Sequence, residues 1–92
     1  MPHPIRGSSK DKILIELIEA DVEIGFGLVD AAKGYRVSGQ PELIFRVLQD
    51  AADVLADIER RLHELGDSES LPFHPLVAEL RNEIAGVRSA KF

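Results

Sequence analysis

The chain has 92 residues, of which 45% are apolar and 29% are charged, a composition typical of a folded globular domain. Its 11 Lys and Arg residues against 16 Asp and Glu residues give a net charge of −5. This acidic balance disfavours binding to nucleic acid, which depends on neutralising phosphates. Because the sequence contains no cysteine, disulfides, thiolate zinc sites and cysteine nucleophiles are excluded.

The first nine residues predict an N-terminal arm, because prolines, a glycine and two serines occur there without periodicity. No positively charged start leads into an apolar run, so we expect no signal peptide and a cytoplasmic location. The longest apolar tract, residues 13–29, is interrupted by four acidic residues, which argues against a membrane span.

The next segment predicts a helix over about residues 10–34. At about 100° per residue, five of its charged residues fall within one narrow sector; they are Lys12, Glu16, Glu19, Glu23 and Asp30. Apolar residues fill most of the remaining circumference. Because a helix packed against a single layer needs an apolar face of only about 100° or slightly more, this helix requires more than one neighbour.

Two further helices are predicted, over about residues 41–65 and 75–88. Pro41 suits the first turn of a helix, Gly66 suits the position after its end, and a polar loop follows. Residues 10–92 therefore predict a single all-α domain, built from a long antiparallel helical hairpin and a shorter third helix.

The lengths of these helices predict self-association. The third helix spans only about 20 Å against nearly 40 Å for each long helix, so we expect it to cover only the first half of helix one. The second half then keeps an uncovered apolar surface, which marks an interface. We expect a homodimer whose four long helices form a bundle. Its predicted interface residues are Leu17, Asp21, Ile24, Gly25, Leu28, Ala31 and Tyr35.

Asp21 is unusual because it falls on this apolar surface. It could pair with Arg46 or Arg61, within the chain or across the dimer, and so determine the register. Alternatively, a kink at Gly25 and Gly27 could turn Asp21 towards water. As a third possibility, Asp21 is a functional carboxylate in a cleft.

The sequence offers few groups for catalysis or metal binding. Glu59 and His63 are spaced four residues apart and share one helical face, but such a pair supplies two ligands at most, and a solvated surface pair is the competing interpretation. The Glu-x-x-His spacing of di-iron bundles is absent, and no nucleophile stands beside a plausible base. We expect neither a catalytic site nor a cofactor.

Two functions remain open. We expect a non-catalytic helical interaction or adaptor module that acts as a homodimer and docks a protein partner, without binding nucleic acid or a membrane. The alternative is a small-ligand or metal-binding helical bundle that uses Asp21 and the neighbouring glycines, or Glu59 and His63.

Overall fold

A computed structural model of the chain describes residues 9–89. The elements in order are α1 (Ser9–Val37), α2 (Pro41–Glu64), the short α3 (Asp67–Ser70), the 3-10 helix η1 (Leu71–Phe73) and α4 (His74–Ser89). No strand occurs between residues 9 and 89, which confirms the predicted all-helical fold. Apart from Ser9, the predicted N-terminal arm lies outside the described residues.

A tight turn at residues 38–40 separates the two long helices. The backbone N–H of Gln40 donates to the carbonyl of Tyr35 at 3.0 Å, and that of Gly39 donates to Arg36 at 3.2 Å. This pair of bonds is the Schellman arrangement, which needs a left-handed residue just after the helix. Gly39 supplies it with a φ of 72°, and Pro41 then occupies the first turn of α2.

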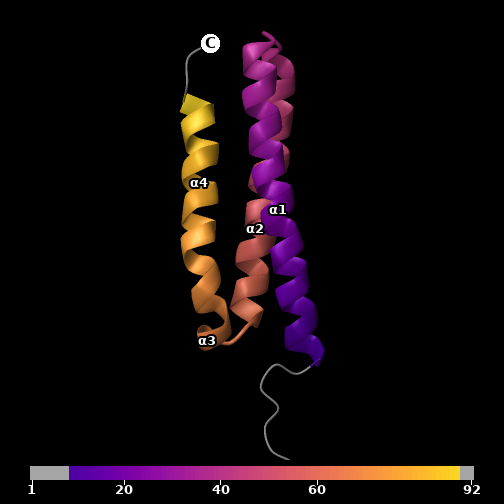
Figure 1. Cartoon of the computed structure of the whole chain (residues 1–92), viewed down its shortest axis with the longest axis vertical. Helices are drawn as coiled ribbons and strands as arrows, with labels where there is room; N and C mark the ends of the chain where they lie inside the picture. Colours follow the sequence, from indigo (N-terminus) through magenta and orange to yellow (C-terminus); the bar gives the residue numbers. More distant parts are fainter. Residues whose placement is uncertain (1–8, 90–92) are drawn as a thin grey trace, which may run out of the picture.

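The long helices lie side by side, and α4 runs beside them (Figure 1). The core lies where the three helices meet, because each contributes one apolar face there. It consists of Leu14, Ile18, Val22, Val29, Ala32, Ile44, Leu48, Ala51, Ile58, Leu65, Phe73, Val77, Leu80, Ile84 and Val87. Helical packing of this kind is consistent with a bundle.

The prediction of a polar loop after α2 is wrong in one respect, because most of this segment is helical. The backbone N–H of Ser70 donates to the carbonyl of Gly66 at 3.0 Å, and the Ser70 hydroxyl donates to the carbonyl of Asp67 at 3.0 Å. Local hydrogen bonds thus close one turn, and Phe73 buries its side chain in the core. The segment contributes to packing instead of only connecting two helices.

The expectation that the third helix covers only the first half of helix one is also wrong. Leu80 of α4 packs at Gly25, and Lys33 forms an ion pair of 2.6 Å with Glu83. Arg61, near the end of α2, contacts Asp21 of α1. The contacts of Leu80 and Glu83 show that α4 runs beside the second half of α1 as well.

α1 is one continuous helix from Ser9 to Val37, and Asp21 is not turned towards water, since its side chain is 19% exposed and pairs with Arg61. Gly25 is buried, and a Cβ placed on it would lie 2.7 Å from Cδ2 of Leu80. Gly25 therefore allows α4 to approach α1 closely and is not a hinge.

Candidate functional site

One line of α1 carries large apolar side chains that nothing in the described chain covers. Ile13, Leu17 and Ile24 are 56%, 41% and 51% exposed. The small residues between and after them on the same line are also exposed. The spacings alternate between four and three residues, as in the seam of a coiled coil. We call this line the α1 stripe; it comprises Ile13, Leu17, Ala20, Ile24, Gly27 and Ala31.

The α1 stripe is separate from the side of α1 that faces the core. At about 100° per residue, the buried residues of α1, such as Ile18 and Val29, lie 100° or more around the helix from the middle of the stripe. The charged sector predicted from the sequence is exposed and borders the stripe on its other side. The broad apolar surface of α1 is thus divided, with one part covered by α2 and α4 and the other open.

Gly27 lies on the α1 stripe, and the packing of the described residues does not explain it. A Cβ added there meets no atom within 4 Å, whereas one added to Gly25 meets Leu80. Glycine weakens a helix interior relative to alanine. The two glycines thus differ, because Gly25 is required by α4 and Gly27 faces open space.

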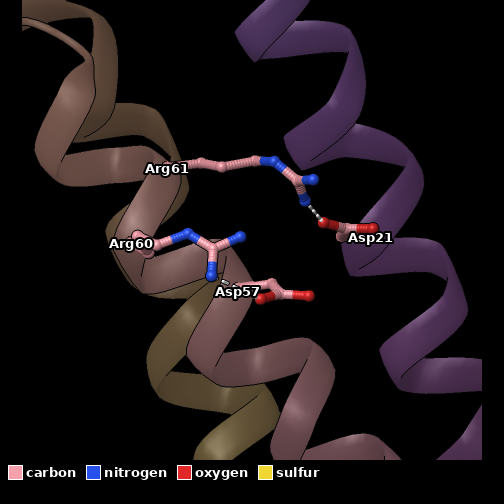
Figure 2. A network of polar contacts seen from close by, with 4 residues as sticks. All are labelled: Asp21, Asp57, Arg60 and Arg61. Carbon is pink, nitrogen blue, oxygen red and sulfur yellow. Dashed lines mark hydrogen bonds and ion pairs between the residues drawn. The ribbon is translucent and has the colours of Figure 1, made fainter.

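Asp21 lies beside the α1 stripe and pairs with Arg61 of its own chain (Figure 2). The guanidinium donates a hydrogen bond to a carboxylate oxygen, and the side chains are only 23% and 19% exposed for Arg61 and Asp21. Glu59 lies two residues before Arg61, about 200° around α2, and pairs with Arg81 of α4. The Asp21–Arg61 pair therefore joins α1 to α2 on the side away from α4.

The structure divides the seven residues predicted as an interface. Leu17, Ile24 and Ala31 lie on the exposed α1 stripe. The other four take part in contacts within the chain: Asp21 pairs with Arg61, Gly25 contacts Leu80, and Leu28 and Tyr35 are partly buried against the core.

Sequence reasoning missed three members of the stripe, namely Ile13, Ala20 and Gly27. Their signal was the alternating spacing with Leu17, Ile24 and Ala31, which the sequence displays. The signal was obscured because the whole circumference outside the charged sector is apolar, so no single line was distinct.

A pocket of about 660 Å³ lies between the end of α2, the short α3 and α4. The polar side chains that line it include two histidines, one arginine and two acids: His63, His74, Arg81, Glu59 and Asp67. Its apolar walls include Leu62, Leu65 and Val77. Nothing in the sequence brings His74 near His63.

The Glu59–His63 metal candidate gains no support from this geometry. The Glu59 carboxylate pairs with Arg81 of α4, so a cation occupies the position that a metal would need. Within residues 9–89, no cluster of three or more His, Asp or Glu residues has the arrangement of a metal site. The same part of the chain contains no helix that is both long and apolar enough to cross a membrane.

Comparison with protein-family models, with curated proteins and with solved structures finds no match for this chain.

Proposed function

We propose that the protein is a non-catalytic helical interaction module that acts as a homodimer, in which two antiparallel α1–α2 hairpins associate through the open face of α1. One observation carries the proposal: Ile13, Leu17 and Ile24 are about half exposed on a single line. Isolated apolar residues at a surface are ordinary, but a continuous apolar line at coiled-coil spacing favours a helical partner.

The exposed area sets the expected strength of association. Full burial of an aliphatic side chain contributes about 1.5–3 kcal/mol, so burying the exposed half contributes about 1 kcal/mol. Three large side chains from each of two copies then give roughly 6 kcal/mol before any loss of translational freedom. Partly buried residues at the stripe's edge, such as Leu28, add to this. Because 6 kcal/mol without any loss corresponds to about 40 μM, we expect a dissociation constant no tighter than tens of micromolar, in the high micromolar to millimolar range.

Light scattering over micromolar to millimolar protein concentrations tests this proposal. The unmodified chain should shift from monomer to dimer, and Ile24→Glu should remain monomeric because it places a charge in the seam. Leu71→Glu is the matched control, since Leu71 is 61% exposed on η1, outside the α1 stripe. A monomer mass for the unmodified chain throughout, with helical circular dichroism retained, would refute the homodimer.

The pocket at the end of α2 favours a second candidate function, binding of a small organic anion. His63, His74 and the Arg81 donors that its pair with Glu59 does not use can bind a carboxylate. The apolar walls can contact the body of such a ligand. A ligand that binds only the folded chain raises its melting temperature. Thermal melts with a panel of aliphatic and aromatic carboxylates test this proposal. It would be rejected if no carboxylate raised the melting temperature of the unmodified chain more than that of Arg81→Met.

A further inference from the structure

We propose that the partner of the α1 stripe is α1 of a second copy running in the opposite direction, with the two-fold axis level with Val22. This inference rests on the proposed homodimer and specifies its geometry. Around this axis the stripe residues meet in three kinds of pair. Ile13 lies opposite Ala31 of the second copy, Leu17 opposite its Gly27, and Ala20 opposite its Ile24.

Each of these pairs combines one large and one small side chain. A large residue fills the space above the small one, so successive layers interdigitate at a uniform helix separation. Two-fold symmetry produces every pair twice, once from each copy, as an isologous interface requires. The six residues of the stripe are thus complementary to themselves only when the second helix is reversed.

The same stripe fits poorly against a parallel copy. Parallel pairing would place Ile24 against Ile24 of the second copy and Gly27 against its Gly27. The isoleucine layer would hold the helices apart and leave the glycine layer unfilled. Because unfilled space between packed side chains is destabilising, side-chain size favours the antiparallel arrangement.

Gly27 is the smallest member of these pairs. No atom lies within 4 Å of a Cβ added there, so the described chain gives no reason for a glycine. In the antiparallel dimer Leu17 of the second copy lies over Gly27, and the missing side chain makes room for it.

The charged edge of the stripe has a measurable consequence. Glu16, Glu23 and Asp30 are exposed along this edge, and the antiparallel dimer brings Glu23 beside Glu23 of the second copy. Glu16 similarly approaches the second copy's Asp30. Exposed like charges repel weakly and salt screens them, so salt should strengthen self-association. A basic partner helix on this surface would bind less tightly as salt increases.

Single cysteines can map the register, because the chain contains none of its own. Ile13→Cys and Ala31→Cys chains are oxidised in a glutathione buffer, separately and as a mixture. Two copies of residue 13 would lie about 27 Å apart along the antiparallel helices, whereas a disulfide needs Cα atoms about 4–7 Å apart. Glu19→Cys, on the exposed charged side, is the control for random collision.

We expect the mixture to form mainly the disulfide between positions 13 and 31, and each chain alone to form no more disulfide dimer than Glu19→Cys. Disulfides between identical positions would overturn the antiparallel register while the homodimer stands. A dimer mass without the mixed disulfide would also overturn the register alone. A monomer mass at every concentration would overturn the register and the homodimer together.

Exchanging the large and the small residue of one pair gives a second test, read from the dimer dissociation constant. Ala31→Ile should raise the dimer dissociation constant about tenfold or more, because it opposes Ile13 of the second copy. Adding Ile13→Ala restores a large–small pair and should return the constant to within about threefold of the original. If Ala31→Ile tightens the dimer, Ile13 does not oppose position 31 and the inference is wrong.

Discussion

The Asp21–Arg61 pair offers a direct measure of how strongly α2 is attached to α1. We consider Asp21→Asn and Arg61→Met, which remove the charges and keep most of the side-chain volume. Exposed ion pairs contribute less than about 1 kcal/mol, and removing one partner of a fully buried pair costs about 3–5 kcal/mol. The pair is about one-fifth exposed, so we expect each single substitution to cost about 2 kcal/mol.

In a domain of this size 1 kcal/mol corresponds to about 4–8 °C in melting temperature, so each substitution should lower it by roughly 8–16 °C. The double variant should be less destabilised than the sum of the single effects, with a coupling energy of about 1–2 kcal/mol. Urea denaturation followed by circular dichroism measures these free energies. All variants must be compared at one protein concentration, since dimerisation would contribute to stability.

A second set of single and double variants, at another ion pair, provides the control. Glu59 and Arg81 also form an ion pair between helices, but their side chains are 41% and 54% exposed. Glu59→Gln and Arg81→Met should therefore show a coupling energy below about 1 kcal/mol. A coupling for Asp21–Arg61 no larger than this control would refute the argument that partial burial makes the first pair the stronger link.

Two glycine substitutions are predicted to have opposite effects, both measured by the same denaturation assay. Gly25→Ala should destabilise the fold by about 1–2 kcal/mol, because the new Cβ would lie 2.7 Å from fully buried Leu80, which has little room to move. Gly86→Ala should stabilise it by about 0.5–1 kcal/mol, because a Cβ there meets nothing within 4 Å in α4. Equal effects at the two positions would show that helix propensity alone decides them and that α4 does not pack closely at Gly25.

The helices themselves were predictable because the signals that form them are local. The predicted boundaries near residues 10, 41 and 75 lie within one residue of the starts of α1, α2 and α4, where capping and periodicity depend on adjacent residues. The α3–η1 segment was missed, because its four- and three-residue elements are too short for a periodic pattern.

The candidate surface was predictable only in part. Leu17, Ile24 and Ala31, three of the predicted interface residues, are exposed, but nothing in a helical wheel separates a side covered by α4 from an open one. Gly25 and Gly27 illustrate the limit: they are two residues apart, about 200° around the helix, and only one contacts Leu80. The pairing of Glu59 with Arg81 likewise required knowing where α4 lies.

The sequence by itself determined that the chain is helical, that α1 is apolar over too much of its circumference for a single neighbour, and that Asp21 interrupts this surface. These properties follow from periodicity along one helix. Only the tertiary structure decided that α4 packs at Gly25, that Arg61 of the same chain pairs with Asp21, and that the α1 stripe stays open. The reason is geometric: contacts between helices depend on the level at which α2 ends and on the rotation of each helix about its axis.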